Sequence, residues 1–334
     1  MPTATPVPAH STVVERSELV LGVLLAVLSG VAVAGQSRIN GELGVRLGDG
    51  VLAAVVSFGG GLLLMLLLVP LVPRARAGVA KLRAALRDRS ILLWQCVGGF
   101  GGATLVATQG LTVGQLGVAL FVVAVVAGQT GSSLLVDRAG LGPSAARPYT
   151  WPRILGAGLT IVAVVWAMSG RIGGGVALWL IVLPLLAGCA IAVQQAINGR
   201  VHAAAGSALT TTLLNFVTGT SLLVVIWLVQ APFHAPVRGF PSEPWLYLGG
   251  PIGVVFIAIA ALVVRWTGVL LFGLAAIAGQ LVGAVLLDLL VPAPGVTLAT
   301  ATLVGTALTL VAVGVAALPG GAVRRPRVTS ESRE

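Results

Sequence analysis

Two pairs of amide side chains have the types and spacing to bind a ligand. Gln36 and Asn40 are four positions apart, so on a helix they share one face. Gln194 and Asn198 repeat this pair 158 positions later. Each amide both donates and accepts hydrogen bonds, which suits a neutral or zwitterionic polar solute. The same groups could instead join helices, at about 0.6–2 kcal/mol per bond, and both interpretations stay open.

Four more polar side chains fall inside apolar segments. Gln129 and Gln280 are predicted to face inward from two further helices, and Ser57 and Asn215 would complete a polar ring. For Ser57 a bond back to its own helix, and for Asn215 interhelical packing, are equally good interpretations. The eight substrate-binding candidates are Gln36, Asn40, Ser57, Gln129, Gln194, Asn198, Asn215 and Gln280.

Three carboxylates are candidates for coupling transport to an ion. Glu42, Asp137 and Asp288 lie near the ends of apolar segments rather than in their middles. A solvated cap or interface role therefore competes with proton coupling for both aspartates. Glu42 is replaced by Arg200 at the repeated position, which weakens the coupling hypothesis.

Enzyme and cofactor motifs are absent from the sequence. It has no His-Glu-x-x-His, no Gly-x-Ser-x-Gly and no phosphate-binding Gly-x4-Gly-Lys. The three histidines have no metal-ligand spacing, and Cys96 and Cys189 are expected to be packing residues. We expect no catalytic residue, no cofactor and no metal.

The elements that must position these residues are predicted to be membrane-spanning helices. Hydrophobic residues make up 57% of the chain, charged residues 9%, and the mean hydropathy is +1.03. So few charges cannot cover a water-exposed surface, and a helix needs about 20 apolar residues to cross a bilayer. We predict ten spans, at 19–37, 51–70, 91–111, 118–136, 153–169, 176–196, 209–229, 245–264, 268–288 and 298–318.

The basic residues set the predicted orientation. Sixteen of the 20 Lys and Arg residues fall on the side of the N-terminus and four on the other. The positive-inside rule then places both termini in the cytoplasm. This distribution explains the net charge of +10 without nucleic acid. The basic loop at 74–89 is expected to contact anionic lipid headgroups.

The sequence contains an internal repeat. Gly30, Gln36, Asn40-Gly41, Gly48, Phe58 and Gly61 recur with the same spacing as Gly188, Gln194, Asn198-Gly199, Gly206, Phe216 and Gly219. A second block, which includes Gly117, Gln129 and Asp137, recurs 151 positions later. We predict a five-helix repeat at 19–170, an inverted one at 171–320, an N-terminal tail at 1–18 and a basic tail at 321–334. Asn-Gly at 40–41 and 198–199 could also end a helix.

The Gln-x3-Asn-Gly signature and the Gly-Gln-x7-Asp of the fourth span resemble the YdcZ-like branch of the drug/metabolite transporter superfamily. The resemblance implies a tandem fusion of two five-helix units, with an EamA-like fold, in a bacterial inner membrane. It also implies a transporter of unsettled substrate. Together with the amide pairs, the inverted repeat predicts a secondary transporter that moves a small polar or drug-like solute by alternating access. The alternative is a non-transporting structural or assembly subunit. Because one chain holds both halves, a monomer would suffice, although a homodimer is also possible.

Overall fold

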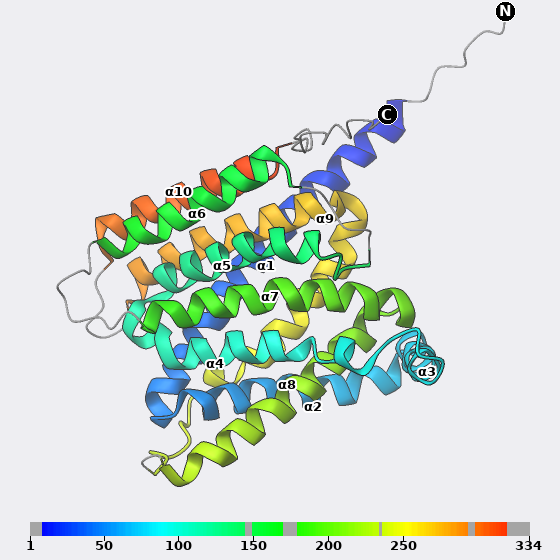
Figure 1. Cartoon of the computed structure of the whole chain (residues 1–334), viewed down its shortest axis with the longest axis horizontal. Coiled ribbons are helices and arrows are strands. Elements are labelled where there is room, and N and C mark those ends of the chain that lie inside the picture. The colour runs from blue at the N-terminus through cyan, green and yellow to red at the C-terminus, as the bar shows by residue number, and fades with distance from the viewer. Residues whose placement is uncertain (1–8, 144–148, 170–178, 234–235, 293–297, 319–334) are drawn as a thin grey trace, which may run out of the picture.

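A computed structural model describes residues 9–143, 149–169, 179–233, 236–292 and 298–318, and these residues form a bundle of α-helices (Figure 1). The first half contains α1 (Ala9–Leu47), α2 (Gly50–Leu71), α3 (Pro73–Arg87), α4 (Gly99–Leu116), α5 (Val118–Arg138) and α6 (Trp151–Ser169). The second contains α7 (Trp179–Ala205), α8 (Ala208–Gln230), α9 (Gly249–Leu290) and α10 (Thr300–Ala316). Short 3₁₀ turns at Leu93–Cys96 and Pro244–Tyr247 precede α4 and α9. The predicted C-terminal tail lies outside the described residues.

Seven described helices are long and apolar enough to cross a bilayer. They are α1, α2, α5, α6, α7, α8 and the second part of α9. The first part of α9 and α10 are apolar but shorter, and α4 has 18 residues with a row of polar side chains. Large apolar side chains such as Leu63, Leu67 and Leu71 are exposed, as expected where a protein meets lipid. The chain is therefore an all-α membrane protein.

The Asn-Gly dipeptides do not end their helices. Both α1 and α7 run past them, to Leu47 and Ala205. The helices end instead at Gly48 and Gly206, whose φ angles of 72° and 63° lie in the left-handed region that glycine adopts without strain. Gly41 stays helical, and a Cβ atom there would lie 2.7 Å from Val113 of α4. Its small size thus serves close packing.

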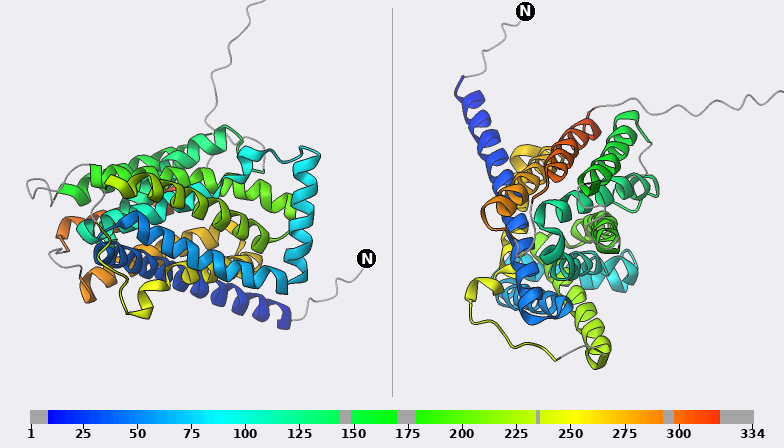
Figure 2. Two further views of the ribbon diagram at one scale, coloured as in Figure 1. Left: turned by 90° about the horizontal axis from the view of Figure 1, so that it is seen from below. Right: turned by 90° about the vertical axis from the view of Figure 1, so that its left-hand side faces the viewer.

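The predicted basic loop at 74–89 is largely the helix α3. Its apolar face, with Ala75, Leu82 and Ala85, is buried against the bundle, and its basic residues are exposed. The left view of Figure 2 shows α3 crosswise to the other helices, at the end where α1 begins. The many basic residues of this segment suggested a loop. Its apolar residues, however, recur at intervals of three and four, which is the pattern of a helix.

Equivalent residues of the two halves make equivalent contacts. A Cβ atom at Gly30 of α1 would overlap the carbonyl oxygen of Ala276 in α9, and one at Gly188 of α7 would overlap that of Val125 in α5. Gly156 and Gly305 pack α6 against α10 in the same reciprocal way. Without side chains at these crossings, the helix backbones approach closely. In Figure 1, α1 and α7 run in opposite directions across the bundle.

Candidate functional site

The two predicted glutamines lie on α1 and α7 and face equivalent glycines. A Cβ atom at Gly253 in α9 would lie 3.3 Å from Gln36 Nε2. One at Gly102 in α4 would lie 3.4 Å from Gln194 Oε1. The absence of side chains at these glycines leaves room for the amides. Both glutamine residues are partly buried as a whole.

Two aromatic rings lie beside the glutamines. Phe58 of α2 and Phe216 of α8 contact each other with ring centroids 5.2 Å apart and planes tilted by 56°. A Cβ atom at Gly102 would lie 3.1 Å from Phe58 Cζ, and one at Gly253 would lie 3.9 Å from Phe216 Cζ. The rings are equivalent residues of the repeat, so the axis that relates the halves passes between them. We call Gln36, Gln194, Phe58, Phe216, Gly102 and Gly253 the central cluster.

The central cluster is polar but uncharged. The Oε1 atom of Gln194 is buried and has no hydrogen-bond partner among the described residues. A buried amide oxygen without a partner costs about 1–3 kcal/mol, which a bound donor would recover. Two amides beside two aromatic rings can hold a solute that combines hydrogen-bonding groups with an apolar or planar surface. No charge in the cluster favours an ionic solute.

The asparagines and Ser57 form a layer next to this cluster. Asn40 Oδ1 and Ser57 Oγ lie against Gly249 at the start of α9. Asn198 and Asn215 lie against Gly98, just before α4, in the equivalent way. Asn40 Nδ2 donates to Gln109 of α4. Asn40 Oδ1, Ser57 Oγ and Asn215 Oδ1 are buried without a hydrogen-bond partner among the described residues, so both solute binding and helix joining stay open for this layer.

Gln109 was not among the candidates from sequence, although it is the most connected amide of this region. Its Nε2 donates to Ser37 Oγ at 2.9 Å, and its Oε1 accepts from Asn40 Nδ2 at 2.7 Å. All three side chains are buried, so α1 and α4 are joined by a sealed hydrogen-bond chain. The repeat search missed Gln109 because Ala260 occupies the equivalent position. Thr104, Thr108 and Thr112 recur every four residues on the same helix, and this polar row could have indicated that Gln109 lies on a helix with polar contacts.

Gln129 and Gln280 lie at helix crossings. The backbone nitrogen of Gln129 is 2.7 Å from the Cβ position of Gly188, and that of Gln280 is 2.7 Å from that of Gly30. Both side chains are partly buried. No described hydrogen bond joins either one to the central cluster, so their predicted role in solute binding stays a prediction.

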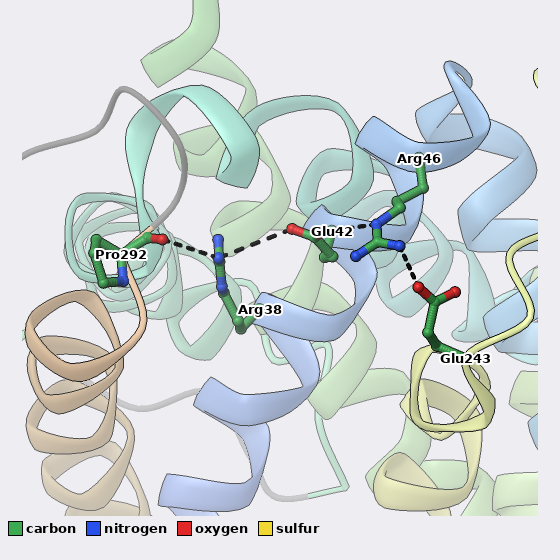
Figure 3. Close-up of polar contacts among 5 residues, drawn as sticks. All are labelled: Arg38, Glu42, Arg46, Glu243 and Pro292. Atoms are coloured by element: carbon green, nitrogen blue, oxygen red, sulfur yellow. Dashed lines mark hydrogen bonds and ion pairs between the residues drawn. The ribbon is translucent and has the colours of Figure 1, made fainter.

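The three carboxylates occupy different environments. Glu42 belongs to a row of charges on α1 in which Arg38 and Arg46 flank it, and Arg46 also pairs with Glu243 (Figure 3). Arg38 donates to the carbonyl oxygen of Pro292 at 3.2 Å. These contacts tie the end of α1 to the segments before and after α9, which is a structural role.

The aspartates, which are equivalent in the repeat, differ from each other. Asp288 is buried and accepts hydrogen bonds from the backbone N–H groups of Val118 and Ala119. Asp137 is partly exposed and pairs with Arg153 at 2.6 Å. The interpretation of the aspartates as helix caps therefore fits Asp288, which caps the start of α5. This cap is buried, whereas the sequence predicted a solvated one.

A groove of about 600 Å³ lies elsewhere, between α6 and α10. Its walls are apolar and include Trp151, Leu155, Val162 and Val315. Such a groove offers a polar solute almost no hydrogen-bonding groups. Among the described residues no group of three His, Cys, Asp or Glu could hold a metal ion.

Apolar helices, lipid-exposed leucines and an uncharged polar cluster between two equivalent halves define a multi-pass membrane protein. The sequence model of one family, described as "Putative inner membrane exporter, YdcZ", matches residues 21–166 and again residues 179–315. The chain therefore belongs to this family, within the drug/metabolite class of membrane transporters.

Other comparisons add little. A solved structure titled "Crystal structure of protein" is similar with a TM-score of 0.49 and 18% sequence identity. The similarity covers 90% of this chain and 96% of that one. No curated protein matches this sequence.

Proposed function

We propose that this protein is a secondary transporter that binds a small, neutral or zwitterionic polar solute at the central cluster. The observation that carries the proposal is the symmetric placement of Gln36 and Gln194, each beside a glycine and a phenylalanine from other helices. One glutamine comes from each half. A solute bound between them therefore contacts both halves, and a movement of one half against the other changes its access to water.

The proposed topology has ten spans in two inverted halves, with both termini in the cytoplasm. The 3₁₀ turns before α4 and α9 add to the length of these two helices. A helix rises about 1.5 Å per residue, so the 18 residues of α4 cover about 27 Å, and the 3₁₀ turn at Leu93–Cys96 lengthens this segment further. The sixteen basic residues of the predicted cytoplasmic side support this orientation. The bilayer would be the bacterial inner membrane, which the family description names.

The exposed basic face of α3 is proposed to bind anionic headgroups at the cytoplasmic surface. Arg74, Arg76, Lys81, Arg83 and Arg87 are all exposed on this 15-residue helix. Each basic residue near an anionic surface contributes about 1 kcal/mol. Because one chain supplies both glutamines, a monomer is the smallest active unit that we propose.

Flux into reconstituted vesicles tests the proposal. Vesicles with the purified wild-type protein are exposed to a pooled set of metabolites, and the solutes that enter are identified by mass spectrometry. For such a solute we expect Gln36→Ala and Gln194→Ala each to lower uptake at sub-saturating concentration by about tenfold, the effect of one hydrogen bond of about 1.4 kcal/mol. Outward flux from loaded vesicles shows whether export is also catalysed.

Gln195→Ala is the matched control. Gln195 is the exposed neighbour of Gln194 on the same helix, so its removal should leave uptake unchanged. Equal loss in Gln194→Ala and Gln195→Ala would contradict the site. If no solute crosses and none raises the thermal stability of the wild type, the chain is the structural subunit of the alternative hypothesis.

A further inference from the structure

Two turns of the molecule share one backbone conformation. Gly117, between α4 and α5, has φ 79° and ψ 166°, and Gly268, inside α9, has φ 74° and ψ 164°. The two glycines are 151 positions apart, the spacing of the second repeat block. Each turn starts the fourth predicted span of its half: α5 in the first, and residues 269–290 of α9 in the second. Their surroundings nevertheless differ.

The Gly117 turn is closed by Asp288 from the other half. The carboxylate accepts hydrogen bonds from the N–H groups of Val118 at 2.9 Å and Ala119 at 2.8 Å. These are the first two N–H groups of α5, which have no partner within their own helix. A negative charge at this end also meets the positive end of the helix dipole. Residues 118–128 are all buried.

The Gly268 turn lacks the equivalent closure. Among the described residues, no atom lies within 4 Å of the Cβ position of Gly268. The residue equivalent to Asp288 is Asp137 at the end of α5, and it would have to reach the N–H groups of residues 269 and 270. It is bound to Arg153 instead. Leu271 is exposed, whereas its equivalent, Leu120, is fully buried.

We propose that Asp288 and Asp137 are alternating latches between α5 and the second part of α9. This inference rests on the proposed alternating-access function. The two helices are in contact, and Figure 1 shows them running in opposite directions. Asp288 lies at the start of α5, and Asp137 belongs to the last turn of α5, at the end of the pair where the second part of α9 begins. In this structure Asp288 holds the end where α1 finishes, and the other end is unlatched. When the halves exchange conformations, Asp137 leaves Arg153 and caps residues 269 and 270, and Asp288 releases Val118 and Ala119.

Arg153 is a positioning residue in this scheme because it holds Asp137 away from the Gly268 turn. It lies near the start of α6, and its equivalent in the second half, at an offset of 149, is Thr302. No cation at the Thr302 position can hold Asp288 in the same way. The resting state should therefore favour the Asp288 latch, as the structure has it.

Hydrogen exchange of the full-length protein in lipid nanodiscs, followed by mass spectrometry, tests the latch without any solute. In the wild type, the amides at 117–120 should exchange at least fivefold more slowly than those at 268–271. Asp288→Asn should speed exchange at 117–120 and slow it at 268–271. Arg153→Gln, which frees Asp137, should slow exchange at 268–271 about fivefold, and adding Asp137→Asn should cancel that change.

The outcomes separate the latch from the proposed function. If Asp288→Asn speeds exchange at 117–120 and leaves 268–271 unchanged, Asp288 is a static cap and alternation is wrong. If Asp288→Asn unfolds the protein and exchange rises everywhere, Arg153→Gln with and without Asp137→Asn decides the question. A vesicle flux that needs Gln36 and Gln194, combined with unchanged exchange in Arg153→Gln, would overturn the latch and leave the transport site standing.

Discussion

The two ends of the bundle, the first where α1 finishes and the second where α7 finishes, are held by different polar side chains. At the second end, Arg200 donates to the backbone carbonyl oxygens of Gly140, Leu141 and Gly142. At the first end, Gln109 joins Ser37 to Asn40, and Asp49 accepts from the indole N–H of Trp227 at 3.0 Å. At the second end the equivalents are Ala260 for Gln109, Ser207 for Asp49 and Val69 for Trp227. The Arg46–Glu243 pair has no equivalent either, because Ala204 and Leu92 stand at those positions.

Glycine contacts, in contrast, follow the repeat closely. Gly30 packs against the second part of α9 and Gly188 against α5. Gly61 and Gly219 each lie against the phenylalanine ring of the opposite half. Small residues therefore set which helices pair, and they do so in the same way in both halves. Unrepeated polar residues, such as Gln109 at one end and Arg200 at the other, then make the two ends different.

The largest effect is expected where the two halves agree. Gly30→Ala and Gly188→Ala each place a methyl group on a backbone carbonyl, and overpacking of this kind costs about 1–3 kcal/mol or more. Both variants should unfold at clearly lower temperature, measured by tryptophan fluorescence of the purified protein. Gly35→Ala is the control, because no described atom lies within 4 Å of its Cβ position. If the losses of unfolding free energy in Gly30→Ala and Gly188→Ala differed by more than about 2 kcal/mol, the two helix crossings would not be equivalent.

An intermediate effect is expected where the halves differ. Gln109→Ala removes two buried hydrogen bonds and leaves the Nδ2 group of Asn40 without its acceptor, at a cost of about 1–3 kcal/mol. Gln195 is the residue equivalent to Ser37, but it is exposed. The free energy of unfolding of Gln195→Ala should therefore stay within about 0.5 kcal/mol of the wild-type value. Thermal unfolding of the two variants side by side checks this. Equal stabilities would mean that the hydrogen-bond chain does not hold α1 to α4.

The smallest effect concerns the exposed ion pair. Two hydrogen bonds lower the pKa of Glu243 below its ordinary value of 4.5: a backbone hydrogen bond has the larger effect, and the hydrogen bond from Arg46 the smaller one. The folded state therefore gains stability from the carboxylate above pH 4.5, and loses it as the pH falls through the lowered pKa. Glu243→Gln should unfold at slightly lower temperature than the wild type at pH 7. The two melting curves should converge under acid conditions, and a difference that persists there would exclude ionisation as its cause.

The family and the all-α membrane class were predictable from the sequence because apolar length and repeated glycines are local signals. The predicted span at 91–111 overlaps α4 (Gly99–Leu116) only in part, because a 3₁₀ turn occupies its beginning. The predicted span at 118–136 and α5 begin at the same residue, since the turn before them needs glycine. The end of α1 was not predictable from Asn40-Gly41: a glycine inside a helix and one that ends it differ only in what packs against them.

The candidate site was predictable in part. Gln36 and Gln194 were found because polar groups stand out in apolar segments, and the structure places each beside an equivalent glycine and phenylalanine. Phe58 and Phe216 were not found, since an aromatic ring in an apolar helix carries no polar signal. Whether an asparagine faces a solute or another helix depends on the neighbouring backbone, here Gly98 and Gly249, which no local pattern encodes.

The contact between Phe58 and Phe216 across the axis has a consequence for the solute itself. A molecule without two-fold symmetry that binds on this axis has two orientations, related by half a turn, in which it meets the same side-chain types. Suppose that the solute keeps its pose while the two halves exchange conformations. The half that contacts one end of the solute then takes the conformation that the other half had before. In the proposed alternating-access cycle, the solute would therefore not need to tumble before its release.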